Sequence, residues 1–184
     1  MSTGTLLAII IPVVVVVAAL ATLGWYTARR RRLRERFGPE YGRTVEDAGS
    51  RVAADRELSE REKRHDALDI RPLSPAVRDR YAGDWQKVQG EFVDRPEDAV
   101  HEADLLVASL MRERGYPTDD LAQKLKDLSV EHGRTVEHYR AAHDVNERSL
   151  QHTATTEQLR GAMVHYRALF DELLSDGGRP QAHT

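Results

Sequence analysis

The hydrophobic residues of this chain follow two different patterns. An apolar run without a single charge extends from Leu6 to Tyr26, whereas beyond Ser74 apolar residues recur every three or four positions between polar ones. As an α-helix, the run would be about 31 Å long, close to the thickness of a membrane's hydrocarbon core. The later spacing is typical of helices with one buried face. The pattern predicts an all-α protein: a single N-terminal transmembrane helix, a polar helical stalk and a compact antiparallel helical bundle.

The predicted stalk is the most polar part of the chain. It contains Glu57 and Arg61, and also Glu60 and Arg64, at the four-residue spacing that favours ion pairs within a helix. A helix with so few apolar positions is expected to cross solvent between the membrane and the bundle. The predicted parts are a transmembrane anchor (1–28), a basic juxtamembrane collar (29–43), a polar stalk helix (44–68), a helical bundle (69–176) and a flexible tail (177–184).

Individual residues predict where helices of the bundle begin and end. Ser74, directly before a proline, is a typical N-cap, and Thr155 with Gln158 has the spacing of a capping box. Gly115 is suited to end a helix, and Gly133 favours a break within the following helical stretch. Short connections between such helices favour antiparallel neighbours.

The basic collar predicts how the chain is oriented in a membrane. Its arginines lie after the apolar run, and no Lys or Arg precedes the run, which is the reverse of the order in a cleaved signal peptide. The sequence Ala19-Leu20-Ala21 resembles a cleavage site, but the charge order favours a retained anchor with its N-terminus outside and its C-terminal domain in the cytoplasm. The collar arginines are Arg29, Arg30, Arg31, Arg32, Arg34 and Arg36.

The collar could also attract anionic lipid headgroups, although the topology interpretation is the simpler one. The rest of the chain has the opposite charge. Of 27 basic and 30 acidic residues, six arginines and one glutamate lie in residues 29–36, so 21 basic and 29 acidic residues remain from Phe37 onward, a net charge of −8. This balance argues against nucleic-acid binding. The absence of cysteine excludes disulfides, thiolate catalysis and cysteine-ligated metals.

Two groups of side chains are candidates for a ligand or partner site. Aromatic residues share one face of the predicted helix after Ser74, and the tetrapeptide His-Tyr-Arg-Ala occurs at 138–141 and again at 165–168. Two Tyr–Arg units could bind an anion, but the periodicity favours aromatic rings in the core. His143 is likewise expected to be a hydrogen-bonded core histidine. The candidates are Tyr81, Trp85, Tyr139, Arg140, Tyr166 and Arg167.

No motif in the sequence predicts catalysis. Glu62 and His65 have the Glu-x-x-His spacing of di-iron bundles, but such a site needs a second pair and two further glutamates. The sequence contains no phosphate-binding glycine loop. His101-Glu102 lacks the second histidine of a zinc-protease motif. We therefore expect no metal, no cofactor and no enzymatic activity.

A series of short stretches in the predicted bundle indicates a family resemblance. They are Asp69–Ser74, Arg80-Tyr81, Trp85, Gln89, Phe92–Asp94, Ala99-Val100, Ala103-Asp104, Met111-Arg112, Arg114–Pro117, Asp127–Val130, Tyr139–His143 and His165–Arg167. Together they resemble a group of uncharacterised bacterial proteins that are often membrane-anchored and sometimes labelled as secreted. The resemblance covers about Phe37 to Leu174 and implies a bacterial source and a shared domain. It implies no known activity or ligand.

These observations favour a membrane-tethered cytoplasmic interaction module, an adapter or scaffold that concentrates a protein partner at the membrane. The alternative is a sensor or enzyme that binds a small anionic ligand through Arg140, Arg167 and the neighbouring tyrosines. Self-association through the stalk is a third possibility.

Overall fold

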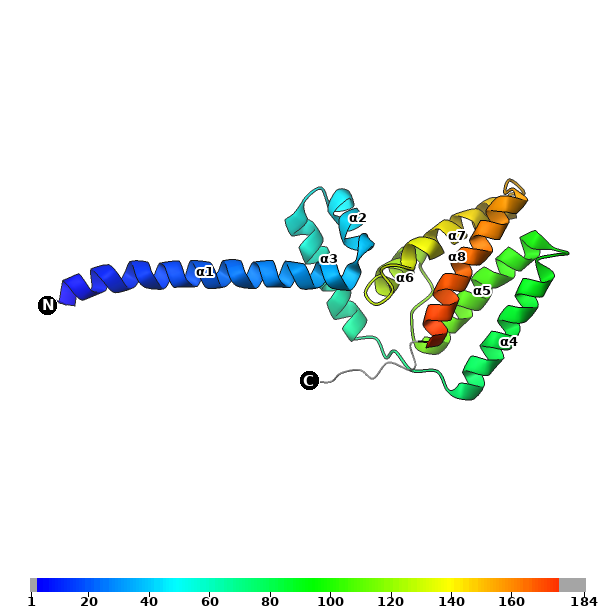
Figure 1. The fold of residues 1–184 in the computed structure, drawn as a ribbon, viewed down its shortest axis with the longest axis horizontal. Helices are drawn as coiled ribbons and strands as arrows, with labels where there is room; N and C mark the ends of the chain where they lie inside the picture. Colours follow the sequence, from blue (N-terminus) through cyan, green and yellow to red (C-terminus); the bar gives the residue numbers. More distant parts are fainter. Residues whose placement is uncertain (1–2, 176–184) are drawn as a thin grey trace.

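Eight helices follow one another over residues 3–175, the part of the chain that the computed structural model describes, with side chains described from residue 11 onward. They are α1 (Thr3–Phe37), α2 (Pro39–Ala48), α3 (Arg51–Asp66), α4 (Pro75–Glu91), α5 (Pro96–Arg114), α6 (Leu121–Leu128), α7 (Val136–Leu150) and α8 (Thr156–Ser175). The described part contains no strand, which confirms the all-α prediction. Figure 1 shows α1 projecting as a long rod from the other helices. The predicted tail at 177–184 lies outside the described residues.

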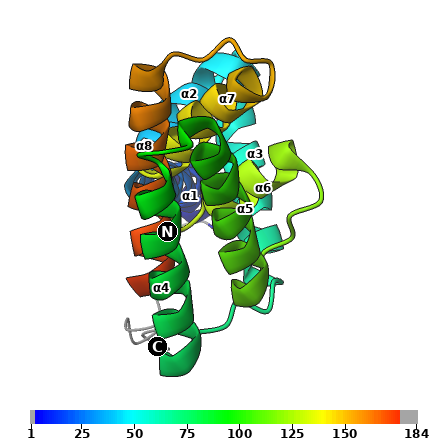
Figure 2. The same ribbon diagram turned by 90° about the vertical axis from the view of Figure 1, so that its right-hand side faces the viewer.

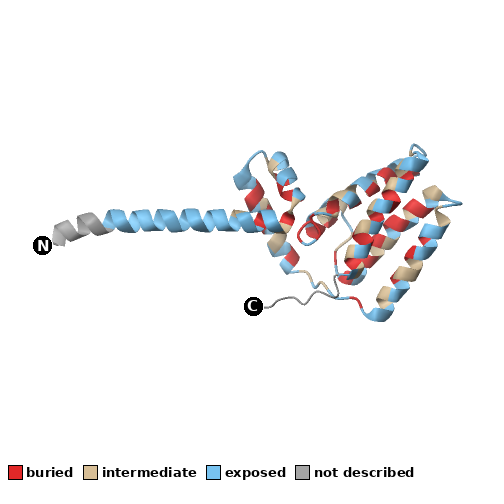
Figure 3. Cartoon of the chain, in the orientation of Figure 1, coloured by how far each residue is buried: buried red, intermediate tan, exposed pale blue. Residues whose placement is uncertain are grey.

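The apolar part of α1 makes no contact that buries it. Side chains such as Val15, Leu20 and Leu23 are exposed in the apolar part of the rod from Ile11 onward, which Figure 3 shows in pale blue. The segment Ile11–Phe37 is the one helix among the described residues that is long and apolar enough to cross a membrane. These two properties fit either a membrane span or a signal sequence at this end of a chain.

The basic end of α1, by contrast, is built into a hydrophobic core. Leu33 and Phe37 are buried there, on the face of α1 that turns toward α2 and α3. We call this group the juxtamembrane core; it comprises Leu33, Phe37, Tyr41, Leu58 and Val130, with Val45 packed against it. Burying two large side chains from its last turns ties α1 to the helices that follow, because each contributes about 2 kcal/mol when fully buried.

The expected single stalk helix over residues 44–68 is wrong. Gly38 and Gly49 both have positive φ, 53° and 66°, and they separate α2 from α1 and α3. The Ser50 side chain then accepts a hydrogen bond from the backbone N–H of Ala53 and caps α3. Two glycines in the left-handed region reverse the chain twice. Consequently α2 and α3 fold against the end of α1 instead of extending away from it (Figure 1).

Of the two ion pairs predicted within the stalk, one forms and the other does not. Glu57 accepts from Arg61 at 2.7 Å, as predicted. Arg64, however, donates to Asp127 of α6 at 3.2 Å and not to Glu60. This pair is one of the contacts through which α3 meets α6.

The second and larger core lies between α4, α5, α7 and α8. In Figure 2 α4, α5 and α8 run alongside one another and α7 lies behind them near the top; the four helices pack in the order α4, α5, α8, α7. The predicted signals at the helix ends are confirmed: Ser74 caps α4, Gly115 ends α5 with φ 96°, and Thr155 and Gln158 hydrogen-bond each other's backbone N–H. The predicted break near Gly133 separates α6 from α7.

Gly133 also joins the two cores. A Cβ atom built on it would lie 2.4 Å from the carbonyl oxygen of Phe37 and 3.1 Å from that of Ser129. Both neighbours are backbone atoms, which cannot turn aside as a side chain can. A glycine is therefore required where the segment before α7 crosses the end of α1.

We predict that Gly133→Ala lowers the free energy of unfolding by about 1–3 kcal/mol, because the added methyl group forces the α1 end and the α6–α7 segment apart. The measurement is urea unfolding of the full chain in neutral detergent micelles, followed by circular dichroism. Gly161→Ala is the matched control: nothing lies within 4 Å of a Cβ there, inside α8. It should leave stability unchanged or raise it by up to about 1 kcal/mol. Equal effects of the two substitutions would contradict the proposed contact.

Candidate functional site

Polar side chains connect α1 and α3 along their whole shared length. The partners differ by 29 or 30 positions in the sequence, so the two helices run in the same direction. Along each helix the partners recur every three or four residues, which keeps them on one face. The pairs are Tyr26–Asp55, Arg29–Ser59, Arg32–Glu62 and Arg36–Asp66. We call this set the α1–α3 polar interface.

Glu62 is the central acceptor of this interface. Its side chain is only 16% exposed, and it accepts hydrogen bonds from both Arg32, at 2.9 Å, and Arg36. By comparison, Arg31 pairs with Glu35 of its own helix, where both side chains are largely exposed. The collar arginines are therefore largely occupied within the protein and do not form a uniform free basic surface.

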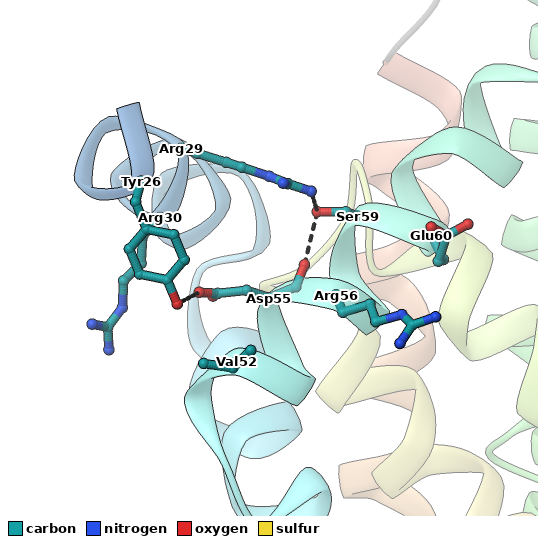
Figure 4. Close-up of a pocket in the computed structure, with 8 residues that line it drawn as sticks. All are labelled: Tyr26, Arg29, Arg30, Val52, Asp55, Arg56, Ser59 and Glu60. Atoms are coloured by element: carbon teal, nitrogen blue, oxygen red, sulfur yellow. Dashed lines mark hydrogen bonds between the residues drawn. The ribbon is translucent and has the colours of Figure 1, made fainter. Parts of the chain in front are cut away.

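A pocket opens between α1 and the first turns of α3, at the end of the interface nearest the apolar run. Its volume is about 180 Å³. Figure 4 shows Arg29 reaching across it to the Ser59 hydroxyl, at 2.7 Å, while the Tyr26 hydroxyl donates to Asp55 at 3.3 Å. The lining residues are Tyr26, Arg29, Arg30, Val52, Asp55, Arg56, Ser59 and Glu60. We call it the α1–α3 pocket.

The structure does not bring the two Tyr–Arg units together as the anion site that was the alternative to core tyrosines. Tyr139 and Tyr166 are buried in the main core. The arginines point elsewhere: Arg140 donates to Glu137, and Arg167 donates to Asp171 at 3.2 Å and to Gln89 at 3.1 Å. The core interpretation of both tyrosines is confirmed.

The aromatic stripe of α4 is also part of the core. Trp85 stacks on Phe170 of α8 with ring centroids 4.7 Å apart. Tyr81 is buried and its hydroxyl lies 3.1 Å from the Ser109 hydroxyl of α5. Neither residue offers a free aromatic surface to a partner.

The repeated tetrapeptide has a structural explanation. It places equivalent residues of the antiparallel helices α7 and α8 opposite each other. His138 and His165 stack with their Nδ1 atoms 3.0 Å apart, and Tyr139 and Tyr166 meet edge to face at 5.9 Å between centroids. The repeat therefore marks the point where the two helices pack.

Sequence reasoning missed a polar cluster inside the bundle. Asp104 of α5 accepts from the Tyr166 hydroxyl at 3.0 Å and from Nδ1 of His143 at 3.3 Å. Lys124 of α6 is buried and donates to the Tyr139 hydroxyl at 3.1 Å. His143 is hydrogen-bonded as expected, but its side chain is half-buried at the edge of the core. One signal could have revealed the cluster: Asp104 falls on the apolar stripe of α5, four residues after the buried Val100.

The ionisation of this cluster follows from its contacts. Burial alone would raise the pKa of Asp104, but the hydrogen bonds from His143 and Tyr166 outweigh it and hold the pKa below its ordinary value. The hydrogen bond to Asp104 raises the pKa of His143. Burial lowers the pKa of Lys124 and raises the pKa of both tyrosines. The members of this polar cluster hydrogen-bond one another, and none of them lines the α1–α3 pocket. Such a network is suited to fixing how the helices pack.

Glu62 and His65 are not arranged as metal ligands. Glu62 belongs to the α1–α3 polar interface, and His65 is buried 3.8 Å from Glu131, with its pKa lowered by burial. Over the described residues no group of three or more His, Asp or Glu side chains is placed to hold a metal ion.

No protein-family model, curated protein or solved structure matches this chain. The resemblance to uncharacterised bacterial proteins therefore stays a prediction, and functional inference depends on the geometry alone.

We predict that Glu62→Ala destabilises the fold by about 1 kcal/mol or more, because it leaves the partly buried Arg36 without its main acceptor. Glu35→Ala removes the same charge from an exposed pair on α1 and should cost less than about 0.5 kcal/mol. Urea unfolding of both variants, as full chains in neutral detergent, measures the difference. A cost for Glu35→Ala as large as that for Glu62→Ala would argue against the α1–α3 polar interface.

The Asp104–His143 pair predicts a pH dependence of stability. Its contribution is complete between the unfolded pKa of Asp104, about 4, and that of His143, about 6.5. It declines as the pH rises through the raised pKa of folded His143, and also as the pH falls through the lowered pKa of folded Asp104. The stability difference between wild type and His143→Gln should therefore be largest near pH 5–6 and smaller at pH 9, as measured by urea unfolding. Asp104→Asn should show the same trend; a difference that is constant from pH 5 to pH 9 in both variants would refute the pairing.

Proposed function

We propose that this protein is a membrane-tethered interaction module without catalytic activity, whose bundle engages a protein partner at the cytoplasmic face of a membrane. The helix α1 is its single transmembrane anchor, with the N-terminus outside. The helices from α2 to α8 form the cytoplasmic part.

The observation that carries this proposal is the continuity of α1. One helix passes from the exposed apolar segment into the juxtamembrane core, where Leu33 and Phe37 are buried. A flexible linker would let the bundle rotate freely about its anchor. A continuous helix packed against α2 and α3 instead holds the bundle at one distance and orientation, which is useful for presenting one surface to a partner.

The charge order supports the proposed orientation. Six arginines directly follow the apolar run, and orientation is decided while the chain is being inserted, before α3 can pair with those arginines. Figure 1 shows that α2 to α8 all lie at the arginine end of α1, so the whole folded part belongs on the side where the collar is retained.

The polar cluster in the bundle supports a role other than catalysis. Asp104, His143 and the two tyrosines are titratable groups with shifted pKa values, which often mark active sites. Here Asp104, Tyr139 and Tyr166 are buried, and their polar atoms are paired with one another or with Lys124. A substrate would need at least one of these groups to face an opening.

The absence of cysteine makes the orientation simple to test, because one introduced cysteine is the only thiol. Val93 lies at the α4–α5 turn and is 83% exposed. We expect Ser2→Cys to react with a membrane-impermeant maleimide in intact cells, and Val93→Cys to react only after permeabilisation. The intact mass of the purified protein should show an uncleaved N-terminus. Labelling of Val93→Cys in intact cells, or loss of residues up to Ala21, would overturn the proposed anchor.

The interaction itself is tested by proximity labelling from a biotin ligase fused to the C-terminus. The matched control is the same ligase fused directly after residue 36, which keeps the anchor and collar but lacks the bundle. We expect at least one protein to be enriched by the full chain over the control. If no protein is enriched by the full chain in several growth conditions, the proposed interaction module is contradicted.

A further inference from the structure

Five of the six collar arginines divide into two groups in the structure, and the sixth, Arg34, lies over the Tyr41 ring. Arg31, Arg32 and Arg36 each form an ion pair with a carboxylate. Arg29 and Arg30 instead donate to neutral hydroxyls, those of Ser59 and Tyr41. Both line the α1–α3 pocket, and in residues 11–175 no carboxylate lies within ion-pair distance of either.

A third arginine enters the same pocket from α3. Arg56 is exposed, and it likewise forms no ion pair within the described side chains. In addition, the Nη2 atom of Arg30 is buried without a hydrogen-bond partner. A buried donor left unpaired costs free energy, and a charged one costs more. The pocket is thus lined by three guanidinium groups that form no ion pair among the described side chains.

The two acidic residues of the pocket balance only part of the charge of its three arginines. Asp55 accepts from the hydroxyls of both Tyr26, at 3.3 Å, and Tyr41, at 2.8 Å. Glu60 accepts from Lys63 at 2.9 Å, and this hydrogen bond lowers the pKa of Glu60, as do the charges of Arg56 and Arg29. Both carboxylates are therefore partly satisfied, and the lining still carries one more positive than negative charge.

The position of the pocket along α1 indicates its surroundings. Tyr26 is the last residue of the apolar run, and Trp25 beside it is largely exposed. Amphipathic aromatic rings prefer the depth of lipid headgroups. Val52, at the start of α3, is also exposed at the pocket rim, with a relative exposure of 68%. An apolar rim beside unbalanced arginines suits a ligand with a phosphate and a hydrocarbon part.

We propose that the α1–α3 pocket binds the phosphate group of an anionic phospholipid. The inference rests on the proposed function, since it places the end of the apolar run at the headgroup layer. Arg29 of α1 and Arg56 of α3 contact the phosphate, and Arg30, which donates to the Tyr41 hydroxyl, contributes its charge from beside them. A volume of about 180 Å³ accommodates one phosphate and the adjoining glycerol atoms, while the acyl chains extend along α1. Guanidinium groups bind phosphate through paired, charge-assisted hydrogen bonds.

The test compares variants of the full chain in neutral detergent micelles with added phosphatidylglycerol, phosphatidylcholine or inorganic phosphate. The readouts are the thermal unfolding midpoint and the number of lipids retained in native mass spectrometry. Arg56→Gln is the main variant, because Arg56 is exposed and makes no ion pair whose loss would unfold the protein. Arg31→Gln is the matched control: it removes the same charge from the same collar, in a side chain that is 83% exposed and outside the pocket.

We expect phosphatidylglycerol, and not phosphatidylcholine, to raise the midpoint and to be retained by wild type. Arg56→Gln should weaken the apparent affinity about tenfold, whereas Arg31→Gln should leave it within about twofold of wild type. Equal losses in the two variants would mean diffuse attraction by the collar and would overturn the site. A response to inorganic phosphate with none to phosphatidylglycerol would overturn the lipid assignment. Loss of the N-terminus in the intact mass would instead refute the anchor, independently of any lipid result.

Discussion

Six arginines within eight residues repel one another strongly unless other groups compensate their charge. In this chain much of the compensation comes from α3, whose carboxylates and hydroxyls meet the collar in register along a parallel helix pair. The two glycines with positive φ make this pairing possible, since they return the chain so that α3 runs in the same direction as α1. Leu33 and Phe37 are then buried beneath the charged pairs. The orientation of the whole bundle relative to α1 follows from this one contact.

A second set of contacts carries that orientation into the bundle. Glu40 of α2 is buried between Arg61 of α3, which donates to it at 3.1 Å, and Arg140 of α7, 3.6 Å away. Burial raises the pKa of Glu40, and the two arginines oppose that shift. Val130 belongs to the juxtamembrane core although it lies between α6 and α7. Charged and apolar contacts therefore coincide where the juxtamembrane core meets the bundle.

The polar cluster around Asp104 gives the bundle a specificity that an apolar core lacks. Aromatic and aliphatic side chains can often repack with little cost. A buried carboxylate that needs both His143 and Tyr166 is satisfied in one arrangement only. The cluster joins α5, α7 and α8, and Lys124 links α6 to it through Tyr139. We interpret it as the feature that fixes how these helices align.

The sequence by itself determined the helical class, the apolar helix, the starts of α4 and α8, the end of α5, and the burial of Tyr81, Trp85, Tyr139 and Tyr166. Those features depend on local capping and on periodicity along one helix. Only the tertiary structure decided the path of the predicted stalk and the partners of Arg140 and Arg167. It also decided the cluster around Asp104 and the α1–α3 pocket. The spacing of Asp55, Ser59, Glu62 and Asp66 did match that of the collar. A polar face, however, has the same periodicity whether it meets water or a complementary helix, and only the folded chain shows which of the two it meets.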